Sequence, residues 1–570
     1  MQIEQLHYVE TLIYASLLFA LFGVVFIPTG KLLLKTFGLH REELNLSLPI
    51  ASSVIFYAFF FGLLSLLRAP AAAIFTALFI IATASLTHWL TTSSYKSLRP
   101  RRALLLHYCF YCLCSSFCSL PTGQIQNASP ATLSSTLGLP IDNLIPYNTS
   151  RLISAQLNLN SLEVVPLWRA TDRGPLAALA NSVVFAILGL EERGHWLLPT
   201  AKLFFVYQSL FIFLNGISLL LVWELCQHHS SQRAASYATL IAGSSYFFFV
   251  NWIFTWPKLL SAVYILLSLS ILDKGEEIEE RKRLIGSGVL FAGALLSHNS
   301  AIFCLCALTM VSLIRALIYG FAIKKALVFA LALSTSLAPW QAYKLLHAKS
   351  SPRLLYLHLF CNRDEKLAEL PLLEAAKKYL NENSLASIFK TRLDNLLYPF
   401  NFLHPKKELK KYWDSPYEFI EHSSHLSFYQ LFFAVGALFF PLFLVALCSA
   451  LRDPSARAFL RITTISYISL LPAIVAFGCP ISTWNHHWAY ATYLCTVVQL
   501  GLYLGRAGPL PRIFAHLALL VNCVVLVHCC YFSENSLLFL HTPNSFVYLQ
   551  LVLFLVFATI SSYPRKLSLK

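Results

Sequence analysis

Long apolar stretches alternate with short polar connections along the whole chain. Apolar stretches of about 20 residues recur, which is the length that a helix needs to cross the hydrocarbon core of a bilayer. Backbone groups cannot stay unpaired in lipid, so these stretches are expected to be helices, and the alternating pattern of a barrel is absent. The pattern predicts an all-α polytopic membrane protein with about fifteen transmembrane helices.

The predicted spans divide the chain into five parts. An N-terminal segment of four spans, 1–120, precedes an extracytoplasmic loop at 121–198, in which 176–190 has the spacing of an amphipathic helix lying at the membrane interface. Central transmembrane helices occupy 199–343, and a second extracytoplasmic segment occupies 344–425. A C-terminal segment of five spans occupies 426–570. The spans are predicted at 11–28, 48–67, 71–90, 103–120, 201–225, 235–250, 259–272 and 284–296, then ending near Arg315 and at 338–341, and at 426–451, 458–477, 488–504, 513–531 and 547–560.

Composition and charge agree with a membrane protein. The chain is 57% hydrophobic and 12% charged, whereas soluble domains are about 25% charged. The net charge of +16 arises mostly from Lys and Arg in short connections, which is the positive-inside pattern and accounts for the charge without a nucleic-acid partner. It predicts an extracytoplasmic N-terminus and a cytoplasmic C-terminus, and we expect the bacterial inner membrane. The basic run at 406–411 is expected to be solvated or to contact anionic lipid headgroups.

The cysteines and the spans offer little chemistry of their own. Fourteen cysteines lie mainly within predicted spans, where cysteine behaves as a small hydrophobe. The spacings typical of metal ligands are missing, so we expect these cysteines to form neither a metal site nor a disulfide framework. A transporter would place ionisable residues near the membrane midplane, and almost none is expected there. The main candidate, His107, is more typical of a packed and hydrogen-bonded helix residue.

Polar residues that could carry chemistry gather instead on one predicted side, outside the cytoplasm. The stretch 139–179 carries Asp142 and Asp172, with Arg151, Arg169 and Arg173 nearby in sequence. Later outside turns and segments add Trp256, Lys258, His298, Arg353, His486 and His487. An acid can serve as a general base. Arg and Lys suit a phosphate group. This combination favours an enzyme that acts at the membrane surface on a lipid-linked phosphate.

Several strings of the sequence together resemble a pattern of the GT-C superfamily of membrane glycosyltransferases, in its poorly characterised bacterial members. They are Leu139-Pro140-Ile141-Asp142-Asn143, Trp168, Asp172-Arg173-Gly174-Pro175-Leu176, Thr255-Trp256-Pro257-Lys258 and Leu296-Ser297-His298. The resemblance covers roughly 142–353. It implies a GT-C-like bundle, a polyprenyl-phosphate-linked sugar as donor, an extracytoplasmic glycan, lipid or protein as acceptor, and a loop acid as general base.

The resemblance leaves the base open. Three spans precede the one that leads into the loop, where many members have one, and the tandem or near-tandem acid pair often found in that loop is missing. Asp142 is the first candidate for the base and Asp172 the second. Asp172 could instead form an ion pair with Arg169 or Arg173, and Asp142 could cap a turn or helix. Some members use a divalent metal, but no spacing here requires one.

The other site residues also have two interpretations. Lys258 and Arg353 are candidates for the donor phosphate, although Lys258 could snorkel to the interface. His298 could contact substrate or cap a helix end. His486 and His487 could line an acceptor groove beside Trp484 and Trp488, but adjacent helical residues point in different directions, so we do not expect both in one site.

Three other functions remain as alternatives. A polytopic transporter or lipid flippase would need a continuous polar cavity and usually has related halves, neither of which is evident in the sequence. A polysaccharide polymerase or ligase of the cell envelope would depend on Arg and His rather than on the loop acids. An inactive relative could act in assembly.

Overall fold

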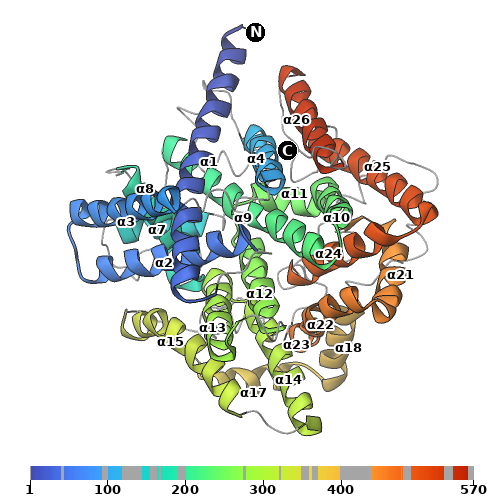
Figure 1. Ribbon diagram of the computed structural model, residues 1–570. Coiled ribbons are helices and arrows are strands. Elements are labelled where there is room, and N and C mark those ends of the chain that lie inside the picture. Colours follow the sequence, from blue (N-terminus) through green and yellow to red (C-terminus); the bar gives the residue numbers. More distant parts are fainter. Residues whose placement is uncertain are drawn as a thin grey trace.

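The described part of this chain, seen in a computed structural model, consists of helices and one short β-hairpin (Figure 1). The structure describes residues 2–39, 44–92, 101–118, 144–154, 163–165, 168–190, 201–273, 278–319, 323–347, 359–361, 370–397, 435–436, 438–476, 478, 490–531 and 544–562. In this part of the chain, seven helices are long and apolar enough to cross a membrane, or up to eight if one sharply bent pair counts as a span. The all-α prediction for an integral membrane protein is confirmed, whereas fifteen spans stay a prediction.

The helix bounds mostly follow the apolar pattern. The N-terminal helices are α1 (Gln2–Thr36), α2 (Ser47–Leu66), α3 (Ala71–Thr91) and α4 (Arg101–Cys118). The first loop contains α7 (Ile145–Ser154), β1 (Glu163–Val165), β2 (Trp168–Arg169), the short 3₁₀ helix η3 (Ala170–Asp172) and α8 (Leu176–Ile187). The central helices are α9 (Ala201–His229), α10 (Gln232–Ser244), α11 (Tyr246–Ile253), α12 (Lys258–Asp273), α13 (Glu280–Ser297), α14 (Ala301–Tyr319) and α15 (Ile323–His347). The remainder are α17 (Leu372–Glu382), α18 (Leu385–Leu397), α21 (Phe439–Arg452), α22 (Pro454–Ile468), α23 (Leu470–Ala476), α24 (Tyr490–Arg506), α25 (Pro509–Tyr531) and α26 (Asn544–Ser562).

Several predicted elements differ from the structure. The first helix is longer than 11–28 and runs on to Thr36. The single span predicted at 235–250 is two helices, because the chain breaks at Ser245, whose side chain accepts a hydrogen bond from the Phe248 amide as the cap of α11. Helix α8 is buried along most of its length against α2, α3 and α7, so it lacks the broad exposed face of an interfacial helix.

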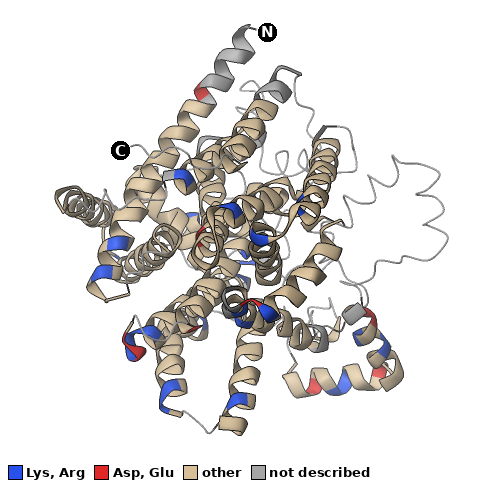
Figure 2. Ribbon diagram, turned by 45° about the vertical axis from the view of Figure 1, so that its right-hand side comes forward, with Lys and Arg blue, Asp and Glu red and all other residues tan. Residues whose placement is uncertain are grey.

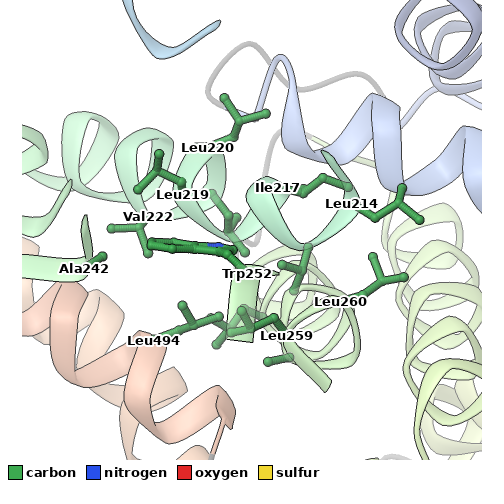
Figure 3. Packing of buried hydrophobic residues seen from close by; sticks show 14 of the residues in the cluster. Leu214, Ile217, Leu219, Leu220, Val222, Ala242, Trp252, Leu259, Leu260 and Leu494 are labelled. Carbon is green, nitrogen blue, oxygen red and sulfur yellow. The ribbon is translucent and has the colours of Figure 1, made fainter. Parts of the chain in front are cut away.

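Helix α9 lies at the centre of the bundle. In its most apolar window 89% of the residues are buried, compared with 17% in α14 and 6% in α15, so α9 is packed by protein while the other two are suited to face lipid. It packs against α1, α2, α4, α10, α11, α12 and α24. Figure 3 shows leucines of α9, α12 and α24 gathered around Trp252 of α11.

Basic side chains make contacts at the ends of several helices. Charged residues are sparse along most of the helices (Figure 2). Four arginines donate hydrogen bonds to backbone carbonyls at helix C-termini, which lack partners inside the helix and carry the negative end of its dipole. These bonds run from Arg102 to Ile560, from Arg506 to His229, from Arg512 to Leu504 and from Arg457 to Leu451.

Ion pairs join further helix ends. Arg461 lies 3.3 Å from Asp273, and Arg506 pairs with Asp453. Lys325 donates a hydrogen bond to Glu280 over 2.6 Å, which lowers the pKa of that exposed carboxyl. The sequence predicts all of these positions on the cytoplasmic side. These contacts therefore connect helix ends that the charge pattern assigns to one side of the membrane. We call these helix ends, together with the charged side chains that join them, the basic face.

Candidate functional site

A broken helix begins the candidate site. Helices α11 and α12 meet at a bend of 107°, across Phe254–Pro257. Such a break frees backbone carbonyls, and Asn215 of α9 compensates for it, because its side-chain amide donates to the carbonyls of Asn251 at 3.0 Å and Phe254 at 3.1 Å. The Trp252 indole donates in turn to the Asn215 carbonyl at 3.0 Å. The bend is thus held by hydrogen bonds to the central helix.

Lys258 is the first residue after this bend. It is only 3% exposed, so it does not extend into open solvent as a snorkelling lysine would. Its ammonium lies 3.2 Å from the ring centroid of Trp256 and 5.8 Å from that of Tyr490, the first residue of α24. Aromatic faces attract a cation, and more strongly where water is excluded. Lys258 and Trp256, both expected at the site, therefore lie together.

The start of α12 lies beside the end of α13. The Ser261 hydroxyl donates to the Ala294 carbonyl at 3.0 Å, and further along the pair the hydroxyls of Ser268 and Ser287 lie 2.6 Å apart. Both contacts fit one antiparallel register. Extended by one turn towards the start of α12, that register places Lys258 at the level of Ser297, the last residue of α13 and the neighbour of His298 in the sequence.

His298 is the C-cap residue of α13, and its side chain bonds to Ser300, just before α14 begins. It is 7% exposed, and its Nδ1 accepts a hydrogen bond from the Ser300 amide at 3.2 Å and lies 2.8 Å from the Ser300 hydroxyl. An Nδ1 that accepts from an amide carries no proton, which places the proton of the neutral ring on Nε2. The cap interpretation of His298 is thus observed, while contact with a substrate stays a prediction.

The first loop reaches this same place through Gly174. A Cβ built on Gly174 would collide with the Leu296 carbonyl oxygen, so the loop backbone rests directly on the end of α13. Only glycine permits so close an approach. The backbone of Asp172, in η3, is two residues away in sequence. The loop motif and the His298 turn, more than a hundred residues apart, are therefore in contact.

The remaining predicted site residues are placed less fully. Arg169 is exposed and Arg173 is half-buried. The Asp172 side chain lies outside the described part of the structure, as do Asp142, Arg353, His486 and His487. Among the described residues no three His, Cys, Asp or Glu side chains gather into a group that could hold a metal ion.

The sequence analysis missed two polar residues of this site. The Tyr490 hydroxyl donates to the side-chain oxygen of Asn251 at 2.6 Å, which ties the start of α24 to the end of α11. Asn251 also donates to the Phe247 carbonyl at 2.7 Å. An asparagine within the aromatic run Tyr246–Ile253 was the available signal, because an amide buried in such a run requires partners.

Two ionisable residues lie inside the bundle, away from any predicted role. His107 is buried, its Nε2 lies 3.2 Å from the Phe213 carbonyl, and it packs edge-on against Phe19, as expected of a structural histidine. The second is Glu224 of α9, which lies near the end of the predicted span 201–225, away from its middle, and is 3% exposed. Its carboxylate accepts hydrogen bonds from the Leu46 and Ser47 amides at the start of α2. The charge pattern assigns the start of α2 to the same cytoplasmic side as the basic face.

Comparisons with known proteins gave one structural similarity to report. No protein-family model and no curated protein matches the sequence. The crystal structure of ArnT from Cupriavidus metallidurans bound to undecaprenyl phosphate is similar to this fold with a TM-score of 0.43 and 12% sequence identity. The similarity covers 74% of this chain and 66% of ArnT, so the chain spans less than two thirds of that protein's length.

Proposed function

We propose that this chain is a membrane glycosyltransferase of the GT-C superfamily, which moves a sugar from a polyprenyl-phosphate donor to an extracytoplasmic acceptor. The observation that carries the proposal is the burial of Lys258 at the start of α12, beside the end of α13 on which the Asp172 loop rests. In this proposal, a cation, a loop acid and a histidine from three distant parts of the sequence would form one site.

Lys258 is suited to the phosphate of the donor. A buried ammonium stabilises an anion more than an exposed one does, because less solvent screens it. The first amides of α12 lack partners inside the helix and would add to the attraction. The lipid tail of the donor would stay in the bilayer beside the bundle. The rings of Trp256 and Tyr490 would hold the ammonium in position while phosphate binds.

A loop acid would supply the general base. It would take the proton of the acceptor hydroxyl as that oxygen attacks the anomeric carbon and the polyprenyl phosphate leaves. One displacement of this kind inverts the anomeric centre. The candidates are Asp142 and Asp172, and the contact of Gly174 with Leu296 supports Asp172, since it ties that part of the loop to the His298 turn.

The test is transfer by the full chain in lipid, using a panel of polyprenyl-phosphate sugars and mixed acceptors. Lys258→Met should reduce kcat/KM about 10- to 100-fold, since a hydrogen bond to a charged group contributes about 1.5–3 kcal/mol. Lys377→Met is the matched control, because Lys377 is an exposed lysine of α17. Asp172→Asn and Asp142→Asn identify the base, with Asp394→Asn of α18 as their control. Wild-type activity in the Lys258 variant and in both loop variants would refute the proposal.

A lipid-phosphate flippase is the second candidate, because of the same broken helix. Transporters often bind anionic substrates at the N-terminus of a half-helix, and α12 begins in this way after a bend of 107°. A flippase would move a fluorescent polyprenyl phosphate across the bilayer of a vesicle without releasing its sugar. The glycosyltransferase would release the sugar to an acceptor on one side only.

A further inference from the structure

We propose that the consecutive helices α17 and α18 lie on the bilayer surface, each with an exposed apolar stripe inserted among the lipids. The stripe of α17 contains Leu373 and Leu380, and that of α18 contains Leu385, Phe389 and Leu393. The three α18 residues are 78%, 69% and 41% exposed, and both α17 leucines are more than half exposed. Large apolar side chains gathered on exposed faces mark a surface that contacts a membrane or another protein.

Helical spacing separates each stripe from a polar side. The α18 residues are four positions apart and share one face, whereas Ser387, two positions before Phe389, lies about 200° around the helix. Leu373 and Leu380 of α17 are seven positions apart and also share a face. The two helices have 11 and 13 residues, which is too short to cross a bilayer. Short helices divided in this way are suited to lie in the plane of the membrane interface.

The opposite flank of each helix is attached to the protein. Ala375 of α17 is buried against Phe360, and the Tyr379 ring lies 5.4 Å from the ring of Phe360. Helix α18 packs against α23, and the Arg392 guanidinium donates to the Leu359 carbonyl at 3.4 Å. These contacts fix which flank of each helix faces the protein, and they leave the two stripes on the outer surface.

The position of α23 indicates that lipid covers the stripes. Ser469, the residue before α23, hydrogen-bonds with Cys304 in the first turn of α14. Helix α14 is long and apolar enough to cross a membrane, and only 17% of its most apolar window is buried. The lipid-facing surface of α14 therefore begins beside α23, on which α18 packs at the lower edge of the view in Figure 1.

Helix α24 gives the level of α23 in the bundle. The Thr492 hydroxyl donates to the Ser466 carbonyl at 2.9 Å, so α23, which begins four residues after Ser466, lies near the start of α24. Helix α24 runs from Tyr490 to Arg506 of the basic face, over roughly 24 Å at 1.5 Å per residue. The hydrocarbon core of a bilayer is about 30 Å thick. Helix α18 thus lies near the membrane surface opposite Arg506, at the end of the bundle that holds Tyr490.

A lysine borders the α18 stripe. Lys390 is exposed and lies three positions before Leu393, so the two are neighbours on the helix surface. A lysine at such an edge extends its stem over lipid and its ammonium to the headgroup phosphates. The two helices would hold the segment 370–397 on the membrane at the end of the bundle where Lys258 lies. This inference goes beyond the proposed function and does not depend on sugar transfer.

The experiment is photo-crosslinking of the full chain in vesicles of phosphatidylethanolamine and phosphatidylglycerol. Benzoylphenylalanine in place of Phe389 should attach to lipid acyl chains, detected by mass spectrometry. Benzoylphenylalanine in place of Ser387, also exposed but on the polar side, is the control and should give several-fold less lipid adduct. An adduct with another segment of this chain or with a second copy, or equal lipid adducts at the two positions, would overturn the proposal.

A charged variant supplies a second readout. With benzoylphenylalanine in place of Leu393, the double variant Leu385→Asp/Phe389→Asp should lose most of the lipid adduct, because two carboxylates oppose insertion of the stripe. Ser387→Asp in the same background should keep the adduct. An undiminished adduct in the double variant would show that the apolar stripe does not hold α18 in the bilayer.

Discussion

Glu224 holds the start of α2, and its removal should destabilise the bundle. The residue at the cap position of α2 is Leu46, which has no side-chain oxygen. The Glu224 carboxylate replaces the missing cap from another helix. It accepts from the Leu46 amide at 2.7 Å, from the Ser47 amide at 3.2 Å and from the Ser47 hydroxyl. A negative charge at a helix N-terminus is also stabilised by the helix dipole.

The magnitude follows from the number of bonds and their burial. A hydrogen bond to a charged group contributes about 1.5–3 kcal/mol, and three bonds to one carboxylate do not add independently. Glu224→Ala would leave buried donors at the start of α2 and remove an attraction for Lys31, a loss of about 3–5 kcal/mol. Glu224→Gln keeps an acceptor oxygen without the charge, so we expect it to lose roughly half as much.

The assay is equilibrium unfolding of the full chain in mixed micelles, followed by circular dichroism as the denaturing detergent is increased. Glu382→Ala is the control, because Glu382 is an exposed carboxylate of α17 whose ion pair with Lys378 spans 3.9 Å. Exposed pairs of this kind contribute about 0–1 kcal/mol. A Glu224→Ala protein as stable as the Glu382→Ala protein would refute the role assigned to Glu224.

Three further variants test the site. Gly174→Ala should reduce transfer at least tenfold, because the added methyl group would push the loop off the Leu296 carbonyl. Gly62→Ala is the control and should be tolerated, because its Cβ would meet Leu179 at an ordinary 3.7 Å. Equal activities of the two variants would contradict the contact between Gly174 and Leu296. Asn215→Leu should cost about 1–3 kcal/mol in detergent unfolding by leaving two buried carbonyls without donors, and an unchanged midpoint would count against it. Tyr490→Phe keeps the ring near the Lys258 ammonium but loses the hydroxyl that bonds to Asn251, so we expect a loss of about 1 kcal/mol in stability. The transfer rate should stay within tenfold of wild type. A loss of transfer as large as that of Lys258→Met would contradict this prediction.

The sequence determined where the chain can cross a membrane, because crossing is a local requirement. A span needs about 20 apolar residues and internally bonded backbone, and both can be recognised within one window. The predicted spans at 48–67 and 71–90 accordingly agree with α2 and α3 to within one residue at each end. The same local logic identified Lys258, a cation in a short aromatic turn, and assigned His107 to packing.

Tertiary structure decided which of these elements meet. Three features join residues that are far apart in the sequence: the contact of Gly174 with Leu296, the cap that Glu224 provides for α2, and the burial of α8. No short stretch of the sequence contains both partners of any of them. The break before α12 was detectable from Pro257, but its stability depends on Asn215 of another helix. The apolar pattern determines which segments form helices. The arrangement of the helices depends on hydrogen bonds to buried polar groups, and these bonds form only when the helices pack together.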